Sequence, residues 1–168
     1  EGNALILLPT RELALQVDEA LSRFGRALGL KSAVLIGGAS MGRQVADIRR
    51  GPDIVIATPG RLIDHLEQRT LNLGSVSILV LDEADRMLDM GFWPQIKKIL
   101  AVIPRDRQTM LFSATLSKEI MALATKHMKT PTSIEVAPSG TTVDKVTQEF
   151  FIVRKEQKGA LLESVLKK

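Results

Sequence analysis

The sequence has no cysteine and no long apolar stretch, and each absence excludes a class of protein. Without cysteine among its 168 residues, the chain can form neither disulfides nor thiolate zinc sites, which suits a reducing intracellular compartment. Its apolar runs, such as those at residues 4–8 and 78–81, are far shorter than the ~20 residues of a membrane-spanning helix. The first residues lack the features of a signal peptide. We therefore expect a cytoplasmic protein.

The sequence also has only a small excess of positive over negative charge. The net charge of +4 would help the chain approach a polyanion, but it is too small to identify one. Hydrophobic residues make up 45% of the 168 residues, enough for one sizeable core. Length and composition therefore predict a single globular domain as the starting hypothesis.

Short apolar runs alternate with longer segments of helical periodicity, as in a parallel sheet covered by crossover helices. Strands are predicted at residues 5–8, 32–36, 53–57, 78–82 and 109–112. Helices are predicted at residues 12–28, 42–49, 60–68, 94–102 and 118–127. The face of the first helix that should pack on the sheet consists of Leu13, Val17, Ala20, Leu21, Phe24 and Leu28. The predicted fold class is therefore α/β.

The composition changes after His127. Residues 128–144 are rich in proline, serine and threonine, which predicts a strand followed by a linker. A new strand is predicted at residues 146–153 and a new helix at residues 155–166. We accordingly divide the chain into a first domain at residues 1–136, a linker at residues 137–145 and the start of a second domain at residues 146–168.

Two adjacent acids, Asp82 and Glu83, come at the end of the apolar strand predicted at residues 78–82. The carboxyl edge of an open α/β sheet is where such folds bind ligands. In nucleoside triphosphatases this layout places the first acid near magnesium and the second beside the attacking water. The alternative is that the acids only begin a helix, where the helix dipole favours them.

Polar segments follow three other predicted strands. Thr10 with Arg11, and Thr58 with Arg61, place a hydroxyl at a helix start and a guanidinium in the first turn, where a phosphate could bind. The alternative is a capped helix without a ligand. The pair at residues 37–38 is Gly-Gly, which allows a close backbone approach or simply a turn.

Ser113 and Thr115 follow the fifth predicted strand. Their hydroxyls could hydrogen-bond an acid from the neighbouring strand end, but residue type alone favours helix capping, a role that Ser117 can also serve. His65 and His127 stand alone on predicted helices, so we expect both at surface or boundary positions. Trp93 is expected to pack at a helix start.

These segments occur in an order that resembles the DEAD-box RNA helicase family, bacterial-type members included. The resemblance extends over residues 4–115 and is carried by Pro-Thr-Arg-Glu-Leu-Ala (9–14), Gly-Gly (37–38), Thr-Pro-Gly-Arg (58–61), Asp-Glu-Ala-Asp (82–85) and Ser-Ala-Thr (113–115). Residues 86–92 are also similar to that family. The end of the chain resembles the family's interdomain linker and the opening of its second RecA-like domain.

The resemblance implies a RecA-like parallel sheet with helices on both faces, and an ATP-dependent RNA helicase that couples ATP hydrolysis to RNA unwinding or remodelling. ATP and Mg²⁺ would be the cofactors. By resemblance, Asp82 would hold Mg²⁺ through water and Glu83 would activate the attacking water. Asp85, with Ser113 and Thr115, would couple the nucleotide state to strand separation.

The resemblance also implies a surface for the RNA backbone. Its residues would be Pro9, Thr10, Arg11, Gly38, Thr58, Gly60 and Arg61. Hydroxyls, helix-start amides and arginines bind phosphate and ribose without reading the bases. Binding should therefore be largely independent of sequence and sensitive to salt.

Two family motifs are missing from the sequence: the glycine-rich phosphate loop ending in Gly-Lys-Thr and the glutamine motif that reads adenine. Residues 25–32 come within one residue of the phosphate-loop pattern, but they lie between a predicted helix and a strand, the reverse of the required order. We reject them as a phosphate loop. We expect a chain truncated at both ends that does not hydrolyse ATP alone.

Loss of the family's phosphate-loop strand should expose the edge of the predicted strand at residues 109–112, which favours self-association. A homodimer could form through this edge or by swapping the C-terminal segment. Two other functions remain open. One is a DNA helicase or translocase of the same superfamily, and the other is a non-catalytic module that binds RNA or associates with itself.

Overall fold

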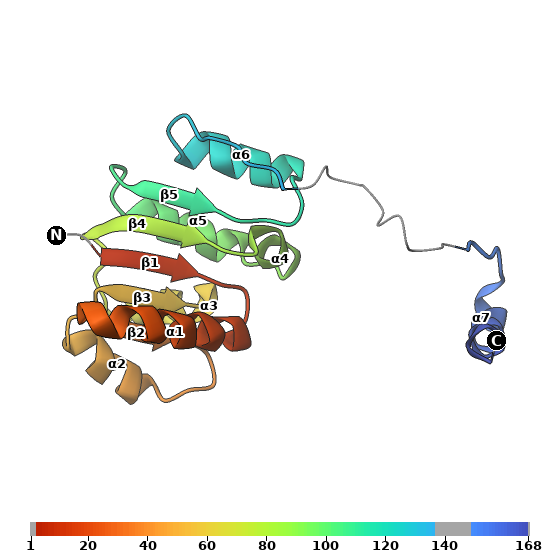
Figure 1. The fold of residues 1–168 in the computed structure, drawn as a ribbon, viewed down its shortest axis with the longest axis horizontal. Helices are drawn as coiled ribbons and strands as arrows, with labels where there is room; N and C mark the ends of the chain where they lie inside the picture. Colours follow the sequence, from red (N-terminus) through yellow and green to blue (C-terminus); the bar gives the residue numbers. More distant parts are fainter. Residues whose placement is uncertain (1–2, 137–148, 168) are drawn as a thin grey trace. The chain divides into compact units, whose positions relative to one another are not determined.

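The computed structural model describes residues 3–136 and 149–167. The chain divides between Ile134 and Glu135 into two compact units. The first contains a parallel sheet with helices on both faces (Figure 1).

Five parallel strands form the sheet, in the order β2-β3-β1-β4-β5. Their bounds are Asn3–Leu7 (β1), Ser32–Leu35 (β2), Ile54–Ala57 (β3), Val76–Leu81 (β4) and Gln108–Leu111 (β5). All five predicted strands are confirmed, with ends that differ by one or two residues. Parallel strands need crossover connections, and in this unit helices supply them.

The helices of the first unit are α1 (Arg11–Gly25), the 3₁₀ helix η1 (Arg26–Leu28), α2 (Met41–Arg49), α3 (Pro59–Glu67), α4 (Ala84–Asp89), α5 (Trp93–Val102) and α6 (Lys118–His127). The five predicted helices are confirmed, whereas the short α4 was not predicted. None of the described helices combines the length and hydropathy that crossing a bilayer requires.

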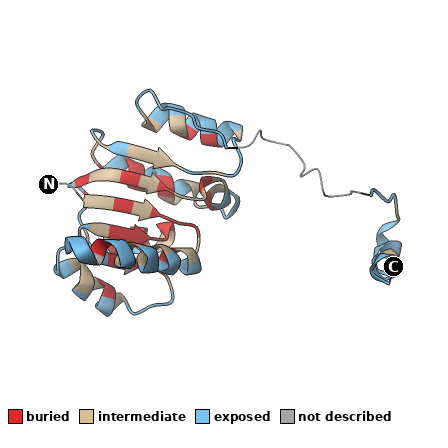
Figure 2. Ribbon diagram, viewed as in Figure 1, coloured by how far each residue is buried: buried red, intermediate tan, exposed pale blue. Residues whose placement is uncertain are grey.

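Two apolar cores lie on opposite faces of the sheet, because successive side chains of a strand point to opposite sides. Leu5 and Leu7 of β1 belong to the larger core, which α3, α4, α5 and α6 cover. Ile6 packs against the smaller core beneath α1, together with Leu8 and Ala14. The buried residues concentrate on the strands and on the inner faces of the helices (Figure 2). Trp93 packs against the larger core at the start of α5, as predicted.

The buried face of α1 is shorter than predicted. Leu13, Val17 and Leu21 pack against the smaller core, but Phe24 and Leu28 are 77% and 75% exposed. The strands β2 and β3 beneath this helix have four residues each, ~13 Å in length, whereas a 15-residue helix is ~22 Å long. The last turn of α1 therefore extends past the ends of the strands.

The second unit contains a 3₁₀ helix, η2 (Lys155–Gln157), followed by α7 (Lys158–Leu166), which confirms the helix predicted at residues 155–166. The predicted strands are wrong where they can be compared, because neither residues 128–136 nor residues 149–153 are in a strand. A strand needs a partner for its backbone groups, and none is present in these described segments. The predicted linker at residues 137–145 lies outside the described residues.

Candidate functional site

The polar segments identified in the sequence meet at the carboxyl edge of the sheet. Leu7 pairs with both Ala57 and Leu81, and Leu81 pairs in turn with Leu111. Four neighbouring strands therefore end level with one another, as the arrowheads in Figure 1 show. The segments that begin at the next residues lie side by side, although 103 residues of the sequence lie between Leu8 and Phe112. This register creates the site.

The two acids after β4 lie at a sharp turn from strand to helix. The Asp82 amide donates to the Leu7 carbonyl at 3.0 Å and so continues the sheet, while the Asp82 carboxylate accepts the Glu83 amide at 2.9 Å. Glu83 has φ 49° and ψ 51°, a left-handed conformation that strains a residue with a side chain. The turn places both carboxylates at the carboxyl edge of the sheet, partly exposed.

Arg86 lies beside Glu83. Its Nη1 donates to Glu83 Oε2 at 2.9 Å, and the two side chains are 54% and 38% exposed. An ion pair this accessible to water contributes little to stability. The carboxylate of Glu83 therefore remains available to a ligand that competes with Arg86.

Asp85 connects the end of β4 to the end of β5. Its Oδ2 accepts both the amide and the hydroxyl of Thr115, each at 3.0 Å. Burial by itself raises the pKa of Asp85, but hydrogen bonds from Thr115, Arg86 and Ser113 outweigh it and lower the pKa below its usual value. Capping, which residue type favoured for this segment, is instead the role of Ser117, whose hydroxyl accepts the Ile120 amide at 3.3 Å. The structure thus brings together three of the predicted site residues.

Arg11 and Gly38 meet from the ends of β1 and β2, two strands that β3 separates. Gly38 has φ +72°, and a Cβ built on it would lie only 2.3 Å from Arg11 Nη1. The positive φ favours glycine at this position, and a side chain here would also displace the flexible end of Arg11. Thr10 caps α1 as predicted, with its hydroxyl accepting the Leu13 amide at 3.3 Å.

Thr58 and Gly60 begin α3, with Pro59 at the first helical position. Thr58 occupies the N-cap position, but in the described structure its hydroxyl does not accept a helix amide, so the predicted side-chain cap is wrong. Its backbone amide donates to the Leu35 carbonyl at 3.0 Å, and the residue is buried in the sheet edge. The hydroxyl therefore leaves the first-turn amides of α3 uncovered.

Arg61 points inward, unlike Arg11. Its side chain is only 13% exposed. Its Nη1 donates to the Ala39 carbonyl at 3.0 Å and to Gln44 Oε1 at 3.2 Å, and its Nε lies 3.4 Å from the Asp64 carboxylate. The guanidinium therefore ties the loop after β2 to α3.

His65 is fully buried, with 0% exposure, so the prediction that it lies at the surface or a boundary is wrong. Its Nε2 lies 2.9 Å from Gln44 Oε1 and its Nδ1 lies 2.7 Å from Thr70 Oγ1. A signal for this burial was present, because His65 follows the buried Leu62 at the i, i+3 spacing of one helix face. Gln44, also buried, carried no comparable signal in the sequence.

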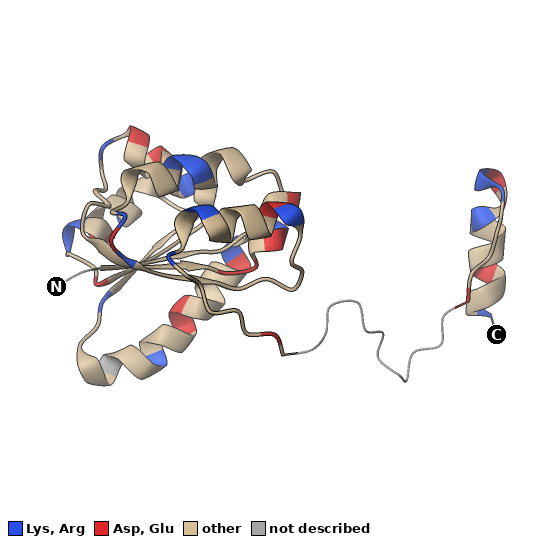
Figure 3. Cartoon of the chain, turned by 90° about the horizontal axis from the view of Figure 1, so that it is seen from above, with Lys and Arg blue, Asp and Glu red and all other residues tan. Residues whose placement is uncertain are grey.

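The described residues include no group of three or more acidic, histidine or cysteine side chains that could hold a metal ion. Magnesium in phosphate-transfer sites usually takes one or two carboxylates, with phosphate oxygens and water completing its shell. The Asp82 carboxylate fits such a shared site, although the protein does not form a complete cage. Lys and Arg alternate with Asp and Glu over the helices, so the sign of the surface charge does not by itself mark a ligand site (Figure 3).

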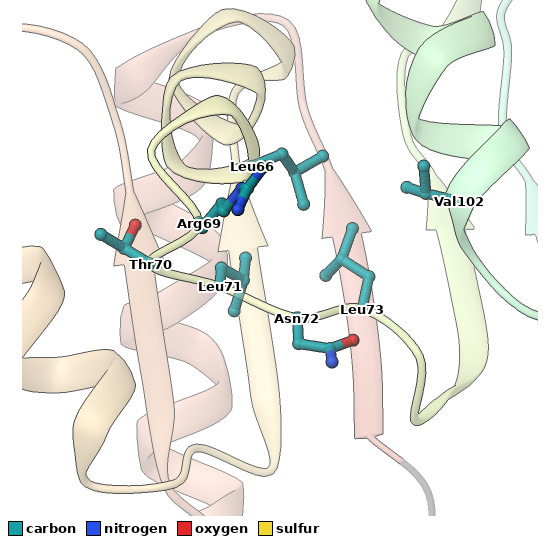
Figure 4. Close-up of a pocket in the computed structure, with 7 residues that line it drawn as sticks. All are labelled: Leu66, Arg69, Thr70, Leu71, Asn72, Leu73 and Val102. Atoms are coloured by element: carbon teal, nitrogen blue, oxygen red, sulfur yellow. The ribbon is translucent and has the colours of Figure 1, made fainter.

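A cavity of about 420 Å³ lies away from these residues. Leu66, Arg69, Leu73 and Val102 are among the residues that line it (Figure 4). The segment that follows α3 enters β4 at its amino end, so this cavity is at the opposite edge of the sheet from Asp82. It does not belong to the candidate site.

Comparison with known proteins identifies the family. The model of the DEAD/DEAH box helicase family matches residues 1–123. This chain belongs to that family. The five parallel strands with helices on both faces accordingly agree with the RecA-like fold that the resemblance implied.

Among its relatives, the ATP-dependent RNA helicase DbpA of Bacillus subtilis is 45% identical over 97% of this chain and 34% of its own length. The DEAD-box ATP-dependent RNA helicase 30 of Arabidopsis thaliana is 57% identical over 76% of this chain and 22% of its own length. This chain of the DEAD/DEAH box family thus spans at most about a third of these two relatives.

Solved structures of family members agree with the fold. A hypothetical ATP-dependent RNA helicase from Sulfolobus tokodaii superposes with a TM-score of 0.72 and 39% identity, over 77% of this chain and 39% of that one. The yeast DEAD-box splicing factor Prp28 gives a TM-score of 0.73 and 37% identity, over 76% of this chain and 31% of that one.

The histidines of this DEAD/DEAH box chain predict how its stability depends on pH. Burial and the neighbouring Arg61 lower the pKa of His65 below 6.5, although Asp64 opposes them. The unfolded chain therefore binds more protons than the folded chain, and stability falls as the pH drops below about 6.5. We expect the melting temperature to decline between about pH 7.5 and about pH 5, and to decline less in His65→Gln.

His127, whose pKa burial and nearby cations also lower, supplies the matched control for this measurement. His127→Gln should remove its own share of the decline and leave the share of His65. The low pKa of Asp85 acts on stability only at still more acidic pH, because its usual value is 3.8. Equal pH dependence in His65→Gln and the unaltered chain would contradict the assignment.

Proposed function

We propose that this chain is part of an ATP-dependent RNA helicase and supplies acids for ATP hydrolysis together with a surface for the RNA backbone. The observation that supports this most directly is the double hydrogen bond from Thr115 to Asp85, because it joins the acid segment after β4 to the segment after β5. The relatives' names support the same activity, since DbpA is an ATP-dependent RNA helicase.

The acids after β4 divide the hydrolytic work in this proposal. Glu83 would orient the attacking water and accept its proton, because its carboxylate is partly exposed and within reach of the strand end. Asp82 would hold Mg²⁺ through water. Bound with ATP, Mg²⁺ would supply the positive charge that offsets the phosphate oxygens.

Asp85 would transmit the nucleotide state. A shift of the turn that carries Asp82 and Glu83 would move Asp85, and the paired hydrogen bonds would carry this displacement to Thr115 and, with Ser113, to the segment before α6. The amide and the hydroxyl of Thr115 both donate to one carboxylate oxygen, so a displacement of that oxygen would break both hydrogen bonds or neither. This two-contact link suits a coupling element.

RNA would bind beside the acids, on the segments after β1, β2 and β3. Arg11, the hydroxyl of Thr10 and the first-turn amides around Gly60 would contact phosphates and ribose, with Pro9, Gly38 and Thr58 shaping the surface. Arg61 was expected on this surface, but its inward hydrogen bonds support a role behind it. Contacts of this kind read no bases, so the proposed binding is sequence-independent.

RNA binding provides the first test of this surface. Arg11→Ala should weaken binding to a single-stranded RNA roughly three- to tenfold, because a charged phosphate contact is lost. It should also reduce the salt dependence of binding by about one ion. Fluorescence anisotropy at several salt concentrations measures both. Arg23→Ala is the matched control, since Arg23 lies exposed on the same helix and pairs with Glu19. Equal effects of the two substitutions would reject the proposed surface.

ATP hydrolysis by this chain alone provides the second test. The 168 residues contain no Gly-Lys-Thr segment to cradle the phosphates, so we expect no turnover above background with Mg²⁺-ATP. Release of phosphate measures it, with Glu83→Gln as the control for contaminating activity. Clear Mg²⁺-dependent turnover that Glu83→Gln abolishes would contradict the expectation. Binding of RNA without any influence of nucleotide would favour a non-catalytic RNA-binding module.

We also propose that the chain associates with itself through β5. Among the described strands, β5 pairs with β4 alone. The Phe112 amide donates to Leu81 at 2.8 Å, so the backbone groups of alternate residues, Leu111 and Thr109, face the open edge. Phe112 and Leu116 are 54% and 49% exposed beside it. An open edge with exposed apolar neighbours favours pairing with another chain.

Light scattering of the concentrated chain should therefore report a species larger than a monomer. Thr109→Pro removes an outward amide and should restore the monomer, since proline is tolerated on a free edge. A chain ending at Ile134 separates this route from exchange of the C-terminal unit, because it keeps the compact first unit. A monomer at high concentration of the unaltered chain would overturn the proposal.

A further inference from the structure

We propose that His65 is a positioning residue for RNA binding: through Gln44 it holds the loop after β2 in the conformation that seats Arg11. The inference rests on the proposed RNA-binding function and adds a residue that does not itself reach the surface. His65 is fully buried, so it would act only through the groups that it contacts.

The first step is the orientation of the imidazole. Gln44 donates its Nε2 to the Ile36 carbonyl at 2.9 Å, so its Oε1 is an acceptor. His65 Nε2 lies 2.9 Å from that oxygen and must therefore carry the proton. The other ring nitrogen, Nδ1, lies 2.7 Å from the Thr70 hydroxyl, whose single proton is shared between Nδ1 and the His65 carbonyl at 3.1 Å. Both ring nitrogens are satisfied in a single tautomer.

The second step is the attachment of the loop. Gln44 holds the Ile36 carbonyl on one side of the glycine pair at residues 37–38, and Arg61 Nη1 holds the Ala39 carbonyl at 3.0 Å on the other. Arg61 and His65 both donate to Gln44 Oε1, at 3.2 and 2.9 Å. The three side chains thus form one clasp that joins α2, α3 and the loop.

The third step is the dependence of Arg11 on this loop. Glycine has more backbone freedom than any other residue, so the Gly-Gly pair cannot fix its own conformation. Gly38 adopts φ +72° directly against Arg11 Nη1, so the position of the loop and that of the flexible guanidinium depend on each other. A loop released from the clasp would change this contact and the direction of the Arg11 guanidinium.

The network differs from an ordinary buried polar group in where it ends. Its hydrogen bonds from Gln44 and Arg61 terminate on backbone carbonyls of Ile36 and Ala39, which flank the loop at the carboxyl edge of the sheet. A histidine that only filled space in α3 would need no such connection. Loss of the Nε2 proton donor of His65 should therefore weaken RNA binding at the surface as well as lower the stability of the fold.

The test compares His65→Leu with His65→Gln in the full chain, using fluorescence anisotropy with a labelled oligouridylate. His65→Leu removes the donor and should weaken RNA binding about three- to tenfold, the effect of one or two hydrogen bonds. His65→Gln can donate its amide to Gln44 Oε1 and should stay within about twofold of the unaltered chain. Rescue by glutamine is the result that a space-filling role would not produce.

Leu62→Ala provides the control for stability, because Leu62 lies fully buried on α3 and belongs to the larger core. Thermal unfolding of each variant is recorded in parallel. Leu62→Ala should lower the melting temperature without weakening RNA binding. A loss of affinity in His65→Leu no larger than in Leu62→Ala would overturn the inference. If His65→Leu does not fold, Gln44→Met, which removes the same clasp and keeps volume, is expected to weaken binding equally.

A double variant tests the route through Arg11. In the Arg11→Ala background, His65→Leu should cause little further loss, because the residue being positioned is gone, whereas independent, additive losses would overturn the route. If Arg11→Ala weakens binding and His65→Leu does not, this inference fails and the proposed function stands. No RNA binding by the unaltered chain, or none lost in Arg11→Ala, would overturn the proposed function as well.

Discussion

The register of the parallel sheet is the constraint on which the candidate site depends. Leu7, Ala57, Leu81 and Leu111 end their strands level with one another, so the next residues of each strand arrive at one edge. Side-chain alternation then sends Leu5 and Leu7 into one core and Ile6 into the other. A shift of one residue in any strand would exchange these faces. Core packing therefore fixes the alignment of the polar side chains at this edge.

This alignment brings the segments near one another but leaves their fine geometry to local contacts. At β4 the geometry comes from a strained left-handed residue, Glu83, and from the two hydrogen bonds between Asp85 and Thr115. At β2 it comes from buried polar side chains behind the loop. The first arrangement is partly exposed, so a ligand can reach it, whereas the second is buried. The proposed RNA surface and the proposed nucleotide-dependent link between Asp85 and Thr115 would need one of each.

The sequence predicted the fold well, because continuous apolar strands and helical periodicity reflect burial that the parallel sheet requires. The predictions were wrong where the position of a residue depends on the length or the presence of a neighbouring element. Phe24 follows the helical pattern of α1 but lies past the ends of four-residue strands. The strand expected within residues 128–136 has the composition of a strand but no described neighbour to pair with. Periodicity indicates which face of a helix a residue occupies, but it does not indicate where the strands beneath that helix end.

The candidate site shows the same division. The pairing of Asp85 with Thr115 could be anticipated, because both follow strands that the fold places side by side. The burial of His65 was missed although its i, i+3 spacing from Leu62 indicated it, and its partner could not be foreseen, since a lone histidine reveals nothing of a distant glutamine. Gln44 lies 21 residues earlier on α2, and only the packed structure shows that it accepts the imidazole proton. Sequence patterns identify residues that share an element or a strand end, and they do not identify partners across two helices.

Arg11 and Arg61 show that two residues in the same sequence pattern can take different positions in the structure. Each follows a threonine at the start of a helix after a buried strand, and sequence reasoning gave both the same role. Arg11 meets Gly38, which offers space and no side-chain acceptor, so its guanidinium stays at the surface. Arg61 meets the Ala39 carbonyl and Gln44 Oε1, two acceptors that draw it inward. The groups that face each arginine therefore decide whether it stays free at the surface, as Arg11 does, or holds the loop from behind, as Arg61 does. The loop after β2 supplies a facing group to both. Gly38, which faces Arg11, and Ala39, whose carbonyl accepts a hydrogen bond from Arg61, are adjacent residues. The conformation of this loop therefore determines the positions of both guanidinium groups.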